Sequence, residues 1–243
     1  MAEPFLSVVV PVYNEERRLS AGLEEILAYL GQFPESWELV LVDDGSRDAT
    51  AHMALQWSRR EPRIRLERLP RNQGKGAAVR AGMLAARGRF RLFRDIDSST
   101  EMGELDGFLP HLRAGAPIVI GSRNARDSRI VRRQMRLREW FGKGFVLLCR
   151  LLLVWEVRDF TCGFKCFSAQ AAEAIFPLQR VHRWAFDAEI LFLAKKLDFP
   201  ILQSPVTWKD EAGSKVRILR DVVCSLWEIF RIKLNDWTGA YRP

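Results

Sequence analysis

Cysteine and histidine are scarce in this chain of 243 residues, and their positions suit neither cross-linking nor zinc binding. The four cysteines, Cys149, Cys162, Cys166 and Cys224, form no CxxC pair, and the three histidines are scattered. A structural zinc site needs several such ligands at short spacing, so we discount one. We expect reduced thiols in a protein that faces the cytosol.

Long apolar runs are also missing. The longest one, from Phe145 to Trp155, has 11 residues and includes Arg150, which makes it too short to span a bilayer. The N-terminal stretch MAEPFLSVVVPVYNEE has no basic region before its apolar run, so it does not read as a signal peptide. Any contact with a membrane should therefore be peripheral.

Several common catalytic and nucleotide-binding motifs are absent. The chain has no GxxxxGK[ST] loop, no GxSxG elbow and no HExxH motif. Gly74 and Gly76 begin a possible dinucleotide fingerprint, but Val79 stands where the third glycine should be. This stretch also follows the third expected strand and not the first, so an NAD-binding fingerprint is excluded.

The first half of the chain alternates apolar runs with segments of helical periodicity. Expected strands cover 5–13, 37–42, 63–69, 89–95 and 117–122, and expected helices cover 17–33, 51–60, 77–88 and 102–115. This alternation is typical of an α/β domain with a mostly parallel sheet flanked by helices. In such a sheet, the loops at the carboxyl ends of the strands build the binding site.

Acidic pairs follow three of the expected strands. They are Glu15 with Glu16, Asp43 with Asp44, and Asp95 with Asp97. Their common position predicts that they converge on one crevice.

The pair Asp95 and Asp97 has the spacing of a possible metal site. Residues two apart in an extended segment point to the same side, so both carboxylates could bind one Mg²⁺ or Mn²⁺ ion, which would also hold nucleotide phosphates. Aspartates are equally favoured in turns, and the spacing alone does not exclude a simple polar turn.

The second half has a different character. Residues 129–158 run from a basic segment into an apolar one, and residues 214–237 place apolar side chains at helical spacing between arginines and lysines. These are either amphipathic helices that pack on the sheet or helices at a membrane interface. The net charge of +8 predicts an anionic partner, which could be nucleic acid, a phosphorylated substrate or a membrane surface. We find no repeat or linker and expect a single domain over 1–243.

The order of the motifs along the chain resembles one enzyme family. The motifs VVVPVYNEE, LVLVDDGSRDAT, NQGKGAAVRAG, RDID and IVIGSR together resemble family 2 glycosyltransferases with the GT-A fold. The later motifs VRDFTCGFKCFS, RWAFDAEILFLAKK and WKDEAGSKVRILRD narrow the resemblance to polyprenyl-phosphate glycosyltransferases, nearest to the dolichyl-phosphate β-glucosyltransferases and next to the dolichol-phosphate mannose synthases. The resemblance extends from about residue 5 to 237.

This resemblance implies roles for particular residues. The residues implied in nucleotide binding are Pro11, Tyr13, Glu15, Asp43, Asp44, Lys75 and Asp95. The resemblance also implies that Asp95 and Asp97 bind Mg²⁺ or Mn²⁺, with Ser99 as a further contact.

The acceptor implied by the resemblance is a lipid monophosphate. A phosphate is already largely ionised near neutral pH, so its transfer needs cationic side chains more than a strong base. Arg123 and Arg133 are the candidates for this role, with Arg132 and Lys215 in reserve. Asp187 is the acidic residue expected near the acceptor.

Glu189 lies two positions after Asp187, on a different face of an expected helix, so only one of the two can face the site.

The expected reaction is the inverting transfer of a hexose, glucose from UDP-glucose, to a polyprenyl phosphate at the cytoplasmic side of a membrane. One alternative is the same fold with GDP-mannose as donor. Another is a saccharide hydroxyl as acceptor, for which Asp187 would have to act as a general base. A basic module that binds nucleic acid would leave the three acidic loops unexplained, and we expect no nucleic-acid partner.

Overall fold

A seven-stranded sheet forms the centre of the protein. The computed structural model describes residues 3–126, 128–132, 136–209 and 218–242. The strands of the sheet, in the order β3-β2-β1-β4-β7-β5-β8, are β1 (Leu6–Val12), β2 (Trp37–Asp43), β3 (Ile64–Arg68), β4 (Phe90–Arg94), β5 (Ile118–Ser122), β7 (Phe164–Ser168) and β8 (Ile201–Pro205). A separate pair, β6 (Arg129–Arg132) with β9 (Thr207–Lys209), lies beside it.

Most neighbouring strands of the large sheet are parallel, as the alternating pattern predicts. The pairs β1–β2, β1–β4, β2–β3 and β5–β8 are parallel, and only β7 runs antiparallel, to β4 and β5. Every residue of β2 is buried, Glu38 and Asp43 included, because helices cover both faces of the sheet at this strand.

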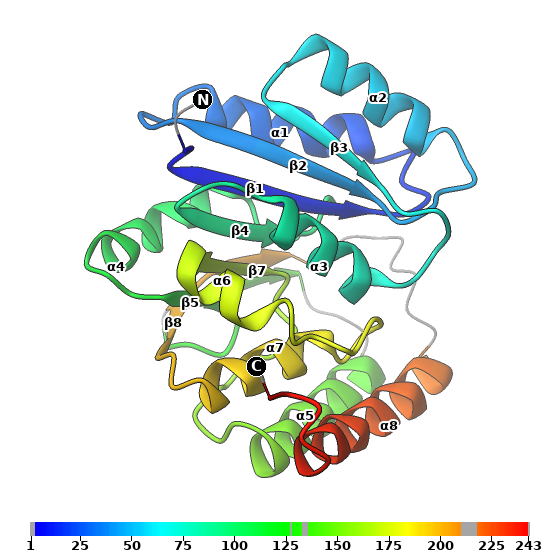
Figure 1. Cartoon of the computed structure of the whole chain (residues 1–243), viewed down its shortest axis with the longest axis vertical. Coiled ribbons are helices and arrows are strands. Elements are labelled where there is room, and N and C mark those ends of the chain that lie inside the picture. Colours follow the sequence, from blue (N-terminus) through cyan, green and yellow to red (C-terminus); the bar gives the residue numbers. More distant parts are fainter. Residues whose placement is uncertain (1–2, 127, 133–135, 210–217, 243) are drawn as a thin grey trace.

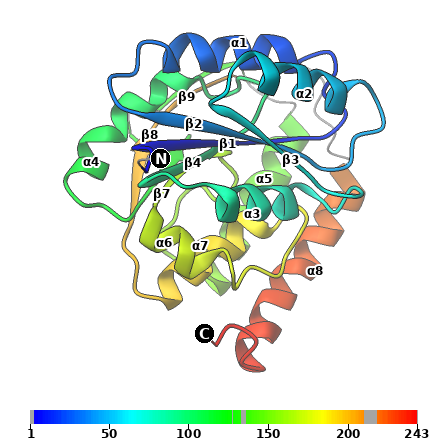
Figure 2. The ribbon, with the colours of Figure 1, turned by 45° about the horizontal axis from the view of Figure 1, so that its top comes forward.

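Helices cover both faces of the sheet (Figures 1 and 2). One apolar core joins the sheet to α1 (Leu19–Leu30), α2 (Thr50–Arg60), the 3₁₀ helix η1 (Met102–Gly107) and α4 (Leu109–Arg113). The other core joins it to α3 (Lys75–Ala85), α5 (Arg136–Leu152), α6 (Ala169–Ile175), α7 (Phe186–Lys196) and α8 (Ile218–Trp237). The α/β architecture predicted from the sequence is therefore confirmed.

Two expected helices differ in the structure. The expected helix over 102–115 is split into η1 and α4, and Pro110 stands in the first turn of α4. Proline has no backbone N–H to continue the preceding turn, which accounts for the break there.

The segment 129–158 is not one helix either. Residues Arg129–Arg132 form β6, which pairs with β9, and the helix α5 covers Arg136–Leu152. The expected helix over 214–237 is present as α8 from Ile218, and residues 214–217 lie outside the described residues. None of the helices in the described ranges is long and apolar enough to cross a bilayer.

Helices α5 and α8 lie side by side at the end of the molecule opposite α1 and α2 (Figure 1). Between these two ends, the carboxyl ends of β1, β2, β3 and β4 point to the same edge of the sheet, because all four strands are parallel.

Candidate active site

The loops after β1 and β2 are joined by backbone and side-chain hydrogen bonds. The N–H of Asp44 donates to the carbonyl oxygen of Val12 at 2.9 Å. Asn14, which has a positive φ of 52°, donates its N–H to Ser46 Oγ at 2.9 Å and accepts from the Arg47 N–H at 2.8 Å. The strand ends thus form one continuous polar rim.

Asp44 extends this rim to the loop after β3. Its carboxylate accepts hydrogen bonds from Asn72 Nδ2 and from the N–H groups of Gln73 and Gly74, at 2.8 to 2.9 Å. The side chain is buried, and burial raises the pKa of Asp44 more than these donors lower it. Gly74 has a φ of 109°, and a Cβ there would overlap with the backbone of His182, so this tight loop requires glycine.

Asp43 is buried as well. Its Oδ1 atom accepts the N–H of Ser46 at 3.0 Å, and its Oδ2 lies 3.4 Å from Arg68 Nε. In this structure both aspartates organise loops, and their contact with a nucleotide stays a prediction.

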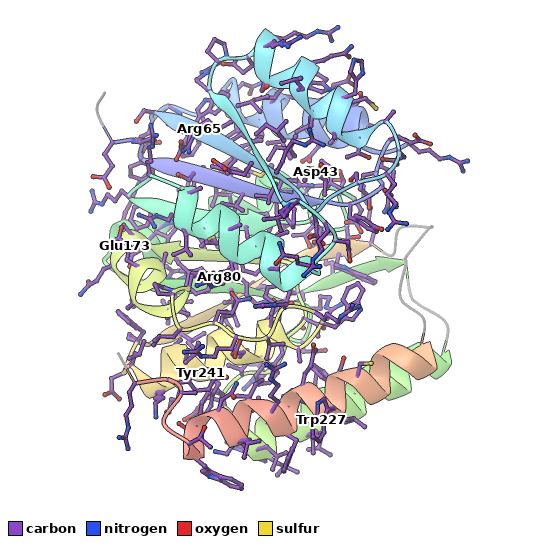
Figure 3. The ribbon with its side chains drawn as sticks, turned by 45° about the vertical axis from the view of Figure 1, so that its right-hand side comes forward. Asp43, Arg65, Arg80, Glu173, Trp227 and Tyr241 are labelled. Atoms are coloured by element: carbon purple, nitrogen blue, oxygen red, sulfur yellow. The ribbon has the colours of Figure 1, made fainter. Side chains whose placement is uncertain are left out.

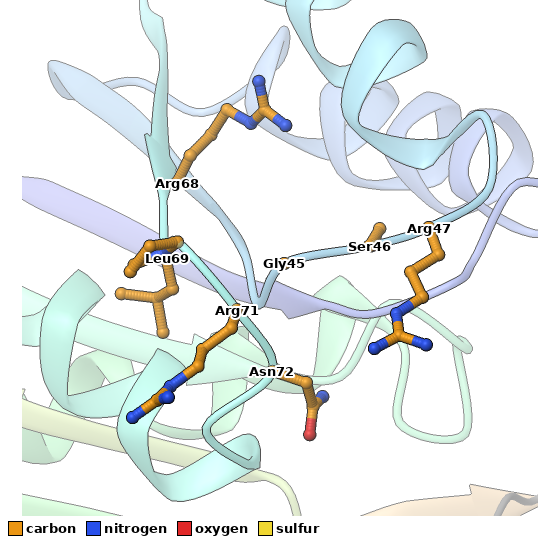
Figure 4. Close-up of a pocket in the computed structure, with 8 residues that line it drawn as sticks. Gly45, Ser46, Arg47, Arg68, Leu69, Arg71 and Asn72 are labelled. Atoms are coloured by element: carbon orange, nitrogen blue, oxygen red, sulfur yellow. The ribbon is translucent and has the colours of Figure 1, made fainter.

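A pocket of about 440 Å³ opens between the loops that follow β2 and β3 (Figure 4). The residues that line it are Gly45, Ser46, Arg47, Arg68, Leu69, Pro70, Arg71 and Asn72. Its mixed lining of backbone, aliphatic groups and guanidinium groups suits a flat polar ring next to an anion.

Lys75, Asp95 and Asp97 meet where β4 ends. Lys75 Nζ lies 2.6 Å from Asp95 Oδ1, and the N–H of Ser99 donates to Asp97 Oδ1 at 3.1 Å. Burial and the charge of Asp95 raise the pKa of Asp97. Burial acts to lower the pKa of Lys75, but the negative charges of Asp95 and Asp187 outweigh it and raise that pKa.

Two residues that the sequence analysis did not single out hold Asp95 and the loop after it. Arg94 is 1% exposed; its Nε donates to the Asp95 carbonyl at 2.9 Å, and its Nη1 lies 2.5 Å from Glu25 Oε2. Gly163 lies so close to the Asp95 carboxylate that a Cβ there would overlap with it. In the sequence, Arg94 could have been noticed as a charged residue next to the apolar residues of an expected strand.

Asp187 and Lys165 form a buried ion pair behind this site. Lys165 Nζ lies 2.5 Å from both Asp187 Oδ1 and the Cys162 carbonyl oxygen. Burial raises the pKa of Asp187, and the ammonium groups of Lys165 and Lys75 oppose this only in part. Sequence reasoning missed Lys165, although a lysine between apolar residues of β7 was visible.

Glu189 points elsewhere. Its carboxylate accepts the N–H groups of Arg180 and Val181 at 3.0 and 2.7 Å, and the hydroxyl of Tyr241. Asp187, in contrast, interacts with Lys75. That Asp187 faces an acceptor stays a prediction.

A model of glycosyl transferase family 2 matches residues 7–176, which is more than half of the chain. The chain belongs to glycosyl transferase family 2. The matched region contains the loops after β1 to β4 and the Asp95–Lys75 contact.

Relatives of this family 2 glycosyltransferase match over nearly its whole length. It is 36% identical to a dolichyl-phosphate beta-glucosyltransferase of Dictyostelium discoideum, with 98% of this chain and 76% of the relative covered. The enzymes of the same name from Drosophila melanogaster and Homo sapiens are 38% and 34% identical, each with 98% of this chain and 77% of the relative covered.

The fold is the expected GT-A fold. A crystal structure of glucosyl-3-phosphoglycerate synthase from Mycobacterium tuberculosis with Mn²⁺, UDP-glucose and glycerol 3-phosphate superposes with a TM-score of 0.68 at 19% identity. The match covers 93% of this chain and 80% of that one. At this identity the likeness establishes the fold alone.

Arg123 of the transferase is already engaged by a carboxylate. Its Nε and Nη2 atoms lie 2.7 and 2.8 Å from the two oxygens of Asp159, and Nη2 also donates to Thr161 Oγ1 at 2.6 Å. Burial acts to raise the pKa of Asp159, but the guanidinium outweighs it and lowers that pKa. This bidentate pair orders the loop after β5, and contact between Arg123 and an acceptor phosphate stays a prediction.

The remaining predicted residues divide into two groups. Pro11 and Tyr13 are half-buried at the end of β1, and Glu15 pairs with Arg18 at 2.7 Å. Arg133 and Lys215 lie outside the described residues, and of Arg132 only the backbone, in β6, is described.

The charges at Asp95 and Asp97 fit a divalent cation. In the described part of the chain, no three side chains of the types His, Cys, Asp or Glu are grouped so that they could hold a metal ion by themselves. A cation here would therefore need oxygens from a ligand besides the two carboxylates, as Mg²⁺ bound to nucleotides commonly does. Burial first, and then the charge of Asp95, raise the pKa of Asp97, and Lys75 opposes this only in part.

Proposed function

We propose that this family 2 glycosyltransferase transfers glucose from UDP-glucose, with inversion, to a polyprenyl phosphate of the dolichyl type. The observation that carries the proposal is the identity of 34% to 38%, over 98% of the chain, to enzymes named dolichyl-phosphate beta-glucosyltransferase. The fold neighbour crystallised with Mn²⁺ and UDP-glucose supports the same class of donor.

The loops at the strand ends supply the donor site in this proposal. The rim built by Asn14, Asp44 and Asn72 holds the loops that would surround the nucleoside, next to the pocket of Figure 4. Asp95 and Asp97 would hold Mg²⁺ or Mn²⁺, which when bound neutralises charge on the diphosphate leaving group.

A phosphate acceptor fits the carboxylates of this site better than a hydroxyl acceptor does, because a phosphate does not need a general base. The phosphate oxygen attacks the anomeric carbon, the bond from that carbon to UDP breaks, and the configuration inverts in one displacement. A hydroxyl would need a general base within reach. Asp187 is 5% exposed and its Oδ1 is bound to Lys165, while Glu189 faces the opposite side, so neither carboxylate is well placed as that base.

The acceptor would come from a membrane surface met by α5 and α8. The large apolar side chains most exposed on and just after these helices are Leu147, Leu151, Leu152, Trp155, Leu226, Trp227, Phe230, Leu234 and Trp237. The positive net charge complements anionic headgroups, and tryptophan favours the headgroup boundary. We place this contact on the cytoplasmic side of the membrane.

One assay tests the proposal. Purified protein, Mn²⁺ or Mg²⁺, a polyprenyl phosphate in mixed micelles and either UDP-glucose or GDP-mannose are incubated, and the glycolipid is quantified by mass spectrometry. We expect a β-linked glucosyl phospholipid from UDP-glucose and none in the presence of EDTA. Product from GDP-mannose alone would reassign the donor, and UDP-glucose binding without any glycolipid would reassign the acceptor.

A further inference from the structure

Helix α8 has two different faces in the part whose side chains are described. Leu226, Trp227 and Phe230 are 43% to 63% exposed on the outer face, and Figure 3 labels Trp227 there. On the inner face Ile229 and Ile232 are buried in the core that α8 shares with α7. A contact made by the outer face is therefore one helix diameter away from the interior of the enzyme.

Glu228, on the inner side of α8, reaches the start of α7. Its Oε2 atom accepts the N–H of Ala185 at 2.9 Å, and Ala185 is the residue that precedes the first turn of α7. That first turn contains Asp187. A carboxylate at a helix N-terminus satisfies an otherwise unpaired backbone donor and interacts favourably with the helix dipole.

The residues that follow α8 reach the same segment by a second route. Tyr241 is 1% exposed, and its hydroxyl donates to Glu189, whose other oxygen accepts the N–H groups of Arg180 and Val181. The guanidinium of Arg180 in turn donates to the Ala240 carbonyl at 3.1 Å. Segment 179–189 is thus held near its two ends by Ala240 and Tyr241 and, at Ala185, by Glu228 of α8.

Segment 179–189 also supports the first turn of α3. Gln179 Nε2 donates to the Gly76 carbonyl at 2.9 Å, and the Ala77 N–H donates to the His182 carbonyl at 3.1 Å. A Cβ at Gly76 would overlap with Phe186, so the two segments are in direct contact. Lys75, which begins α3, therefore depends for its position on the same segment that carries Asp187.

We propose that α8 and residues 238–242 couple lipid docking to donor binding, with Glu228 and Tyr241 as positioning residues. This inference rests on the proposed function for the membrane contact and for the donor. Docking of the outer face on the membrane restrains α8. The hydrogen bonds of Glu228 and Tyr241 then restrain segment 179–189. Because this segment supports the start of α3, Lys75 is held in place before the donor binds. Restraint that is established before binding lowers the entropy cost of binding.

The test measures UDP-glucose affinity by calorimetry, with Mn²⁺ and without acceptor, in the presence and absence of phosphatidylglycerol vesicles. We expect the vesicles to tighten donor binding by about 3- to 10-fold, the effect of one buried hydrogen bond. Because coupling is reciprocal, UDP-glucose should tighten vesicle binding by the same factor in sedimentation.

Two variants and one control separate coupling from folding. Tyr241→Phe keeps the ring and removes the hydroxyl, and Glu228→Leu removes the acceptor for the Ala185 N–H. Both should still sediment with vesicles but should lose the tightening of donor binding. Thr238→Val removes an exposed hydroxyl that bonds only to Leu234 and Asn235 among the described contacts, and it should behave as the wild type.

The outcomes distinguish this inference from the function on which it rests. Wild-type protein that binds both vesicles and donor, with no change of either affinity by the other ligand, overturns the coupling and leaves the proposed function intact. Equal tightening in wild type and Tyr241→Phe would remove Tyr241 from the route. Protein that binds neither vesicles nor UDP-glucose overturns both proposals.

Discussion

The edge of the sheet at which β1 to β4 end, which we propose as the donor site and call the donor edge, differs in its side chains from the α5–α8 pair. At the donor edge, carboxylates such as Asp44 and Asp187 are buried, and each has close hydrogen-bonding or ionic partners within the protein. On α5 and α8, large side chains such as Leu151 and Trp227 are more than 60% exposed. Preorganised polar loops suit a small, highly charged ligand, whereas exposed apolar side chains suit an extended, fluid surface.

The difference predicts that mutations at the donor edge lower the rate of glycolipid formation, whereas mutations on the α5–α8 pair weaken binding to membranes. Asp97→Ala is the strongest test at the donor edge. We expect glycolipid formation to fall by about 10³-fold, because the proposed divalent cation would lose one of its two carboxylate ligands and with it several kcal/mol of charge stabilisation. Initial rates at saturating UDP-glucose measure the loss.

In the same protein, sedimentation with anionic vesicles in the absence of UDP-glucose should be unchanged. Loss of vesicle binding by Asp97→Ala would show that the two regions are not separable.

The buried pair behind the donor edge predicts a large effect on stability. Lys165→Met leaves the Asp187 carboxylate buried without its closest cation, and we expect the free energy of unfolding to fall by about 3–5 kcal/mol. Urea titration followed by tryptophan fluorescence measures this change.

A double variant sharpens that prediction. In Lys165→Met with Asp187→Leu, both charges are gone and most of the lost stability should return. A double variant as unstable as Lys165→Met alone would mean that packing around β7, and not the unpaired charge, accounts for the loss.

On the other side of the comparison, Trp227→Ser combined with Phe230→Ser should weaken vesicle binding by about 10-fold or more, because two side chains can no longer enter the headgroup boundary. The melting temperature should stay nearly constant, since both side chains are exposed. Leu55→Ser on α2 is the matched control: its side chain is 40% exposed at the far end of the molecule. An equal loss of vesicle binding in the double variant and in Leu55→Ser would contradict a specific docking surface on α8.

The same contrast explains how much was predictable from the sequence. The convergence of Glu15, Asp44 and Asp95 on one edge followed from strand order alone, because parallel strands place their carboxyl ends together. The strand β7 was missed, because Lys165 interrupts its apolar pattern and its partners, β4 and β5, are distant in sequence.

Contacts between individual side chains were harder to predict from the sequence than the arrangement of the loops. The spacing of Asp187 and Glu189 indicated that they face different ways, but which partner each would meet depended on Lys165 and on Tyr241, 52 residues away. The pairing of Arg123 with Asp159 was hidden for the same reason: tertiary contacts between distant segments decide which charges remain available to a ligand.

The smallest predicted effect is on the stability of the folded state, which the buried negative charge of Asp97 lowers. Burial and Asp95 raise the pKa of Asp97, so its ionised form destabilises the metal-free folded state at neutral pH. As pH falls through this raised pKa, the folded state takes up the proton first and the penalty disappears. Asp97→Asn should therefore melt at a higher temperature than the wild type at pH 7, and the gap should close as the pH approaches about 4.

Asp48 provides a control of opposite sign for this pH dependence. Burial opposes the effect, but hydrogen bonds from Thr50 and the Glu16 N–H lower the pKa of Asp48, so its ionised form stabilises the folded state. Asp48→Asn should melt at a lower temperature at pH 7. Saturating Mn²⁺ together with UDP, whose phosphates supply the further oxygens that the cation needs, should then reverse the order of wild type and Asp97→Asn, because only the wild type keeps both carboxylates for the proposed cation. An order that Mn²⁺ with UDP leaves unchanged would contradict a metal site at Asp97, since the charge that destabilises the free enzyme is the charge expected to bind the ion.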